Sequence, residues 1–228
     1  MTNRPVIRLA LIPMLTTCVG FGMAASGMLI LGGCSDSREG NEMAKSTVKS
    51  IKQSREEIVE AKNEIGKTLA NLNLLVHQAD LKKSFSDFSD GLENIRDHEE
   101  TVKKQRLKME ENGNEYIKEW QVEIAQFSND ELKKSSIDRQ ASVKKKFAAT
   151  TAAYKELDEV YEPFIKNLTE IQMALRHDLT PASAQNLRPV SESATTEGEK
   201  VQSKADNLLA LLDDLRSSLS SEPGNSSK

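Results

Sequence analysis

The sequence predicts an all-α protein: an elongated antiparallel helical rod, or four-helix up-down bundle, with coiled-coil-like packing. Along four long segments the hydrophobic residues recur every three or four positions, which places them on one face of a helix. No segment shows the alternating pattern of a β-strand. Beyond residue 33 the chain is about one third apolar and about one third charged, a composition that fills a narrow seam between helices better than a thick globular core.

The first 33 residues differ from the rest of the chain. They contain no Asp, Glu or Lys, and two arginines precede an apolar run over residues 9–31. The run ends in Leu31-Gly32-Gly33-Cys34, which resembles a bacterial lipobox: an aliphatic residue and two small residues before an obligatory cysteine. We expect residues 1–33 to be a lipoprotein signal peptide that is cleaved between Gly33 and Cys34. We expect Cys34 to be lipidated there and to carry palmitate-like acyl chains.

A transmembrane anchor is the alternative interpretation, because the apolar run is 23 residues long and could span a bilayer. Both interpretations place residues 35–228 outside the cytoplasmic membrane. By the sorting pattern of Gram-negative lipoproteins, Ser35 after the cysteine favours the outer membrane, facing the periplasm. The acyl chains on Cys34 would then make the membrane itself a partner, because two or more chains give stable anchoring.

The lipidated cysteine and a polar, flexible tether are expected over residues 34–42, before the helical domain at 43–219. The first helix is predicted over residues 43–76, where four apolar residues repeat every seven positions: Ile51, Ile58, Ile65 and Leu72.

The second helix is predicted over residues 80–127, with two rows of seam residues that continue for more than six heptads. Glu99 and Arg106 interrupt one row, where apolar side chains are expected. Gly113 is a weak point in the same row, but the phase of the pattern is unchanged on both sides. We therefore predict one continuous helix.

The third helix is predicted over residues 130–178, with Ser128 and Glu131 as a capping box and a kink at Pro163. Thr180 should cap the fourth helix, predicted over residues 181–219, with Pro181 at its first position. The first half of that helix is weakened by Pro189 and Gly198. Residues 220–228 form a polar tail that is expected to be disordered.

Short turns between helices of similar length favour an antiparallel arrangement. The start of the first helix, the turn at 128–129 and the C-terminus should share one end of the rod. The turns at 77–83 and 178–181 should share the other end.

Several short motifs resemble the bacterial proteins grouped as domain-of-unknown-function family 2959. They include Ile117-Lys118-Glu119-Trp120-Gln121, Phe127-Ser128-Asn129, Pro163-Phe164 and Leu175-Arg176-His177-Asp178-Leu179. The resemblance covers about residues 45–215. It implies an elongated helical fold in a secreted or lipid-anchored protein, and it supplies no activity. The chain departs from the family pattern at Pro189 and Gly198.

No catalytic residues and no metal site are predicted. The sequence lacks phosphate-binding loops, serine hydrolase elbows and His-Glu-x-x-His, and no Glu-x-x-His motif precedes any of the three histidines. Only Cys18 and Cys34 are cysteines, so the helical domain has no disulfide or thiolate metal site. No cofactor is implied, and the net charge of −4 disfavours nucleic acid as a partner.

Glu99 and Arg106 form the possible polar layer of the rod. They could fix the helix register, line a small mid-rod ligand pocket, or rotate into solvent. His77, Leu81, His177 and Leu179 should gather at the end of the rod away from the anchor, where loops on a rigid scaffold tend to make contacts.

The sequence therefore favours a non-enzymatic envelope lipoprotein that acts as a helical spacer or protein-interaction scaffold, with a partner among the envelope proteins. The alternative is a binding module with a small ligand pocket in the polar layer. An enzyme is the third option, without a constellation of residues to support it.

Overall fold

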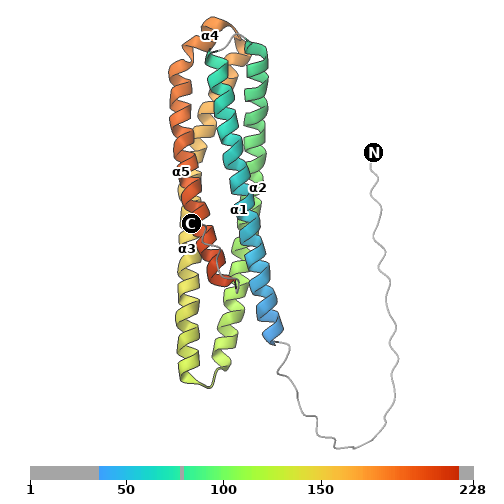
Figure 1. Ribbon diagram of the computed structural model, residues 1–228, viewed down its shortest axis with the longest axis vertical. Coiled ribbons are helices and arrows are strands. Elements are labelled where there is room, and N and C mark those ends of the chain that lie inside the picture. The colour runs from blue at the N-terminus through green and yellow to red at the C-terminus, as the bar shows by residue number, and fades with distance from the viewer. Residues whose placement is uncertain (1–35, 78–79, 221–228) are drawn as a thin grey trace, which may run out of the picture. The chain divides into compact units, whose positions relative to one another are not determined.

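The computed structural model describes residues 36–77 and 80–220, and every regular element in these ranges is a helix. The all-α prediction is confirmed. Four long helices run antiparallel, and a fifth, short helix crosses one end of the bundle (Figure 1). Their bounds are α1 (Asp36–His77), α2 (Leu81–Gln126), α3 (Asp130–His177), α4 (Pro181–Asn186) and α5 (Arg188–Leu219).

The first helix begins earlier than the sequence predicted. Residues 36–42 belong to α1, so the described part of the expected tether is helical. An ion pair between Lys45 and Glu42, 3.1 Å apart, supports these first turns. Extending an established helix by one residue adds one backbone hydrogen bond without a new nucleation cost, which explains how a polar segment continues it.

Side-chain caps define the starts of α2, α3 and α4. Asp80 accepts a hydrogen bond from the Lys83 amide, and Thr180 accepts one from the Ser183 amide, as the sequence predicted for Thr180. At α3 the cap is Asn129, whose Oδ1 accepts from the amides of residues 131 and 132, so Ser128 is not the cap. Asn and Ser are about equally good caps, and α3 begins one residue after the asparagine.

The predicted fourth helix is two helices. α4 ends at Asn186, and α5 starts at Arg188 after the C-cap residue Leu187. Pro189 has no amide hydrogen and its ring clashes with the carbonyl four residues earlier, which prevents an unbroken helix here. By contrast, α3 continues through Pro163.

Each long helix packs against two neighbours: α1 and α3 each contact both α2 and α5. We call the end that carries α4, the last residues of α1 and the first residues of α2 the distal end. The α2–α3 turn and the start of α1 mark the proximal end (Figure 1). The helix ends are therefore distributed as the sequence predicted, except that α5 stops short of the α2–α3 turn.

The buried residues form two clusters along the bundle. The distal core is dominated by large apolar side chains: Leu72, Leu75, Phe88, Leu92, Ile95, Phe164, Leu168, Ile171 and Leu175. The proximal core contains Ile51, Ile58, Met109, Tyr154, Leu208, Leu212 and Leu215. Leu157 packs against both clusters and marks the junction between them.

Candidate functional site

Arg106 lies close to the junction of the two cores, on α2. Its side chain is only 19% exposed, and its Nη1 donates to Asp158 Oδ2 on α3 at 3.0 Å. Its Nε donates to Glu110 Oε1 at 3.1 Å, and its guanidinium lies 5.0 Å from the centre of the Tyr154 ring. Arg106 therefore connects α2 to α3, in a position suited to fix their register.

Glu99 does not join Arg106 in one layer. It forms a short ion pair with Lys103 on the same helix, and this hydrogen bond raises the pKa of Lys103. Seven residues of helix, about 10 Å, separate Glu99 from Arg106. The two polar positions are thus two separate ion-pair sites on the seam.

A cavity of about 50 Å³ lies at the junction, beside Glu99. Side chains from all four long helices line it, including Ile58, Ile65, Val102, Leu157, Tyr161 and Val201. A buried water needs roughly 10–15 Å³ of such space, so the cavity suits a few water molecules. Drug-sized ligands occupy pockets of about 300–1,000 Å³, which is far larger.

Two tyrosines flank this region. The hydroxyl of Tyr161 donates to the Ile95 carbonyl at 3.1 Å, and burial raises the pKa of Tyr161 well above its usual value. The hydroxyl of Tyr154 is buried near Ser54, and neither hydroxyl makes a well-aligned hydrogen bond to a described residue. Burial raises the pKa of Tyr154 to about 12, against smaller opposing effects of Ser54 and of the Arg106 guanidinium. Both phenols therefore stay neutral at physiological pH.

The distal end differs from the expected contact site. Leu81 and Leu179 are partly buried and pack against the distal core, so they are less available to a partner. His77 and His177 are exposed, and His77 Nδ1 lies 2.9 Å from the carbonyl oxygen of Asn73 one turn earlier. Two exposed apolar side chains that the sequence analysis did not select, Leu74 and Met173, belong to the last turns of α1 and α3.

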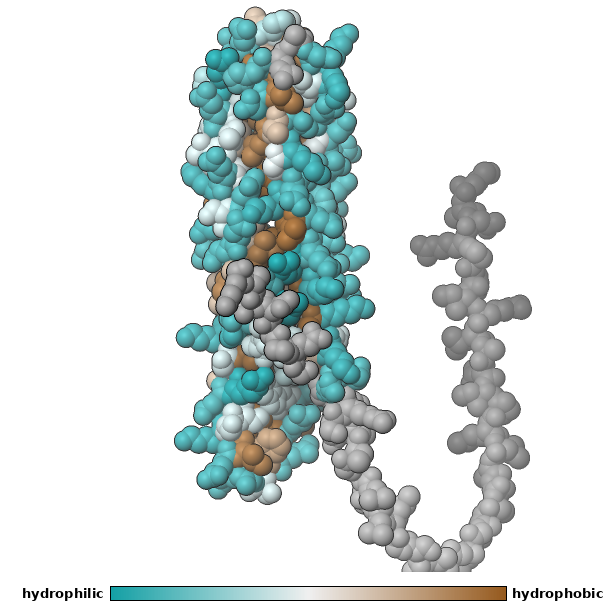
Figure 2. All heavy atoms as spheres, in the orientation of Figure 1, coloured by the Kyte–Doolittle hydropathy of each residue, from teal (hydrophilic) through white to brown (hydrophobic). Residues whose placement is uncertain are grey.

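The proximal end carries exposed apolar side chains where α2 and α3 extend beyond α5: Val122, Phe127, Leu132 and Ile137. Leu132 fits the apolar periodicity of α3 but is 61% exposed. Arg139 donates to the carbonyl of Ser218 near the end of α5, so no residue of α5 lies beside Leu132. Elsewhere the visible surface is mostly hydrophilic, with hydrophobic residues showing in the seams (Figure 2).

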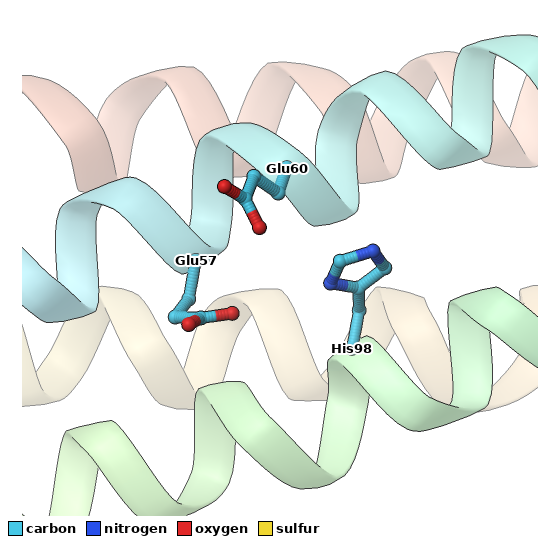
Figure 3. A group of neighbouring side chains, drawn as sticks. All are labelled: Glu57, Glu60 and His98. Atoms are coloured by element: carbon cyan, nitrogen blue, oxygen red, sulfur yellow. The ribbon is translucent and has the colours of Figure 1, made fainter.

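A group of possible metal ligands lies on the outer side of the α1–α2 pair. Glu57 and Glu60 from α1 and His98 from α2 hold ligand atoms within 4.8 Å of one another. Figure 3 shows all three side chains reaching into the space between the two helices. The sequence analysis missed this group because the residues lie on different helices, and only the pairing register of α1 with α2 could have revealed it.

The expected lipid-anchor residues, Gly33 and Cys34, lie outside the described residues, so the lipidation and cleavage of this chain stay predictions. Within residues 36–77 and 80–220, no helix is long and apolar enough to cross a membrane.

A family model described as "Protein of unknown function (DUF2959)" matches residues 37–219, which is most of the chain. The chain therefore belongs to this family, and the resemblance inferred from its motifs is confirmed. The searches among curated proteins and among solved structures both returned no match.

Proposed function

We propose that this family member is a non-enzymatic, lipid-anchored protein of the cell envelope whose helical rod spaces or scaffolds other envelope proteins. The elongated bundle carries the proposal. Its helix α3 alone has 48 residues, which corresponds to about 70 Å. Its apolar side chains are largely used in the seam, and its outer faces are charged. A rod of this kind acts through its surface and its length.

The lipobox supports the anchor. Since α1 begins at Asp36, only Ser35 separates its start from Cys34. Acyl chains on Cys34 would therefore hold the proximal end of the rod near the surface of the outer membrane, facing the periplasm. The distal end would project away from that membrane.

A protein partner at the distal end fits this arrangement best. There the connections at 178–180 and α4 replace regular helix surface, and turns held on a rigid scaffold favour contacts. The exposed His77 and His177 lie there with the apolar Leu74 and Met173. The alternative, a small-ligand module, would use the junction cavity, whose 50 Å³ suits water better than a metabolite, or an open hollow of about 620 Å³ between α2 and α3, lined in part by Glu110 and Thr151.

Mass spectrometry of the mature N-terminus tests the anchor. The expected product begins at Cys34 with a diacylglyceryl thioether, and Cys34→Ser should release the protein from the membrane fraction. Ser35→Ala is the matched control and should stay in that fraction. An intact leader, or an unmodified Cys34, would refute the lipoprotein part of the proposal.

Photo-crosslinking in cells tests the scaffold. Crosslinkers replace exposed residues of similar type at the two ends: Thr180 and Met173 at the distal end, and Asn129 and Ile137 at the proximal end. We expect one discrete adduct from the distal positions that depends on Cys34. Equal or stronger capture at the proximal positions would place the partner at the wrong end for this proposal.

A further inference from the structure

The register of α1 against α2 brings a histidine opposite two glutamates. Asn94 Nδ2 of α2 donates to Glu64 Oε1 of α1 at 3.2 Å, which fixes the pairing at this level. One turn back along α1 is Glu60, and one turn on along α2 is His98. Glu57 lies a further turn back on the same face of α1, since residues three apart are neighbours on a helix.

This register is maintained along the whole helix pair. Toward the proximal end, Thr47 Oγ1 donates to the Asn112 carbonyl at 3.1 Å. Toward the distal end, Asn71 Nδ2 donates to the Asp87 carbonyl at 3.1 Å. The group is therefore held by two long helices pinned on both sides, and not by a flexible loop.

The two carboxylates lack a protein cation. The lysines and arginines of α1 that form ion pairs use other carboxylates: Lys45 pairs with Glu42, Lys52 with Glu56, Arg55 with Asp213, Lys62 with Asp206 and Lys67 with Glu64. Among the described residues, neither Glu57 nor Glu60 forms an ion pair or accepts a hydrogen bond from another side chain. Two close, unpaired carboxylates beside an imidazole form an arrangement that a divalent cation would stabilise.

We infer that Glu57, Glu60 and His98 bind a divalent transition-metal cation of the Zn²⁺ type between α1 and α2. One imidazole nitrogen and two carboxylate oxygens are ligands that zinc accepts, at about 2.0–2.2 Å from the metal. In a tetrahedral site, ligand atoms lie roughly 3.3 Å apart. The ligand atoms now lie within 4.8 Å of one another, so they must move closer together to hold the ion. Changes of glutamate rotamer can supply that movement.

The three proposed ligands are partly exposed, so the site is open to solvent. Glu60 is exposed, whereas Glu57 and His98 are half-buried, so the ion can enter from solvent and complete its coordination with water. The imidazole favours zinc over calcium and magnesium, which prefer oxygen ligands alone. Binding would join α1 to α2 and stabilise the folded bundle, because the unfolded chain does not bring the three residues together. This inference is independent of the scaffold proposal.

Isothermal titration of the purified full-length chain with ZnCl₂, after removal of metals with a chelator, tests the inference. We expect saturable binding of one equivalent and a melting temperature that rises with zinc. His98→Gln and Glu60→Gln should each weaken binding by about tenfold or more, because loss of even an outer-shell partner costs about 10–100-fold. Calcium and magnesium should bind much more weakly.

Matched variants separate this site from general surface binding. His77→Gln removes an exposed histidine at the distal end, and Glu159→Gln removes one exposed negative charge from α3. Both should bind zinc like the parent, and circular dichroism should show the metal-free variants folded. The inference is wrong if one-equivalent binding is absent, survives His98→Gln, is lost in His77→Gln, or is matched by calcium.

Discussion

The two halves of the bundle are held together by different interactions. In the distal half, Phe88, Phe164 and many leucines are fully buried, and uncharged contacts such as Asn71 with the Asp87 carbonyl cross between helices. In the described residues, the ion pairs that join two helices lie at the junction or proximal to it: Arg55–Asp213, Lys62–Asp206, Arg106–Asp158, Lys146–Asp214 and Lys204–Glu156.

Buried polar side chains follow the same division. Most of them belong to the proximal half: Thr47, Ser50, Ser54, Gln140 and Thr150. An exposed ion pair contributes about 0–1 kcal/mol, whereas truncating a fully buried leucine to alanine costs about 2–5 kcal/mol. The distal half should therefore provide most of the stability, and the proximal half should open first in local unfolding.

The largest expected effect comes from the distal core. Leu168 is fully buried, so Leu168→Ala should lower the free energy of unfolding by about 3–5 kcal/mol. Leu157 is only half-buried and borders the junction cavity, so Leu157→Ala should cost about 2 kcal/mol. Urea denaturation followed by circular dichroism measures both. If the two costs are equal, the junction around Leu157 is packed as well as the distal core.

Two buried glycines offer a second, smaller test of the same contrast. A Cβ at Gly198 would lie 2.5 Å from Leu69 and 3.2 Å from Phe164, which are packed in the distal core. A Cβ at Gly113 would lie 2.5 Å from the ring of Phe147, which is only half-buried and can turn aside. Overpacking costs about 1–3 kcal/mol, so we expect about 2–3 kcal/mol for Gly198→Ala and about 1 kcal/mol for Gly113→Ala.

Gly66→Ala is the control for this pair. Its Cβ would meet only Gln202 Nε2, at an ordinary 3.8 Å. Alanine in place of an exposed helical glycine should stabilise the protein by about 0.5–1 kcal/mol. Thermal melts of the three variants should therefore rank Gly66→Ala above the parent and Gly198→Ala lowest; a different order would contradict the packing described for the two halves.

The helical periodicity was sufficient to predict most of the fold. The heptad of Ile51, Ile58 and Ile65 is buried as expected, because a seam residue needs only the phase of its own helix. Leu132 fits the same phase but is exposed, because its burial depends on where α5 ends. The sequence alone could not show which proline breaks a helix. Pro163 is accommodated inside α3, whereas the helix is broken at Leu187, just before Pro189.

The site residues were harder to predict for a related reason. The apolar pattern did not define which residues of α3 lie opposite Arg106, and the structure places Tyr154 and Asp158 there. An error of one turn hardly affects a seam prediction, but it changes every polar partner. To predict that Glu57, Glu60 and His98 lie together, the register of α1 against α2 must be known to within one turn. The apolar pattern of either helix alone does not define that register.

The last prediction concerns the hydroxyl buried in the proximal core, whose effect appears only at high pH. Because the pKa of Tyr154 is raised from 10.0 to about 12, the folded state keeps the phenol proton that the unfolded state loses first as pH rises. The free energy of unfolding is therefore unaffected by this group below pH 10 and falls progressively between pH 10 and about 12. By pH 11 the loss is about 1.4 kcal/mol.

Tyr154→Phe removes both the titration and an unpartnered buried hydroxyl, so the variant should be about as stable as the parent at pH 8 and more stable at pH 11. Urea denaturation at the two pH values measures the difference, and Tyr116→Phe, at a half-buried tyrosine of the same half, is the control that should show a smaller one. If Tyr154→Phe is instead destabilising at pH 8, the hydroxyl has a partner such as a buried water, and the proximal core is better satisfied than its described contacts indicate.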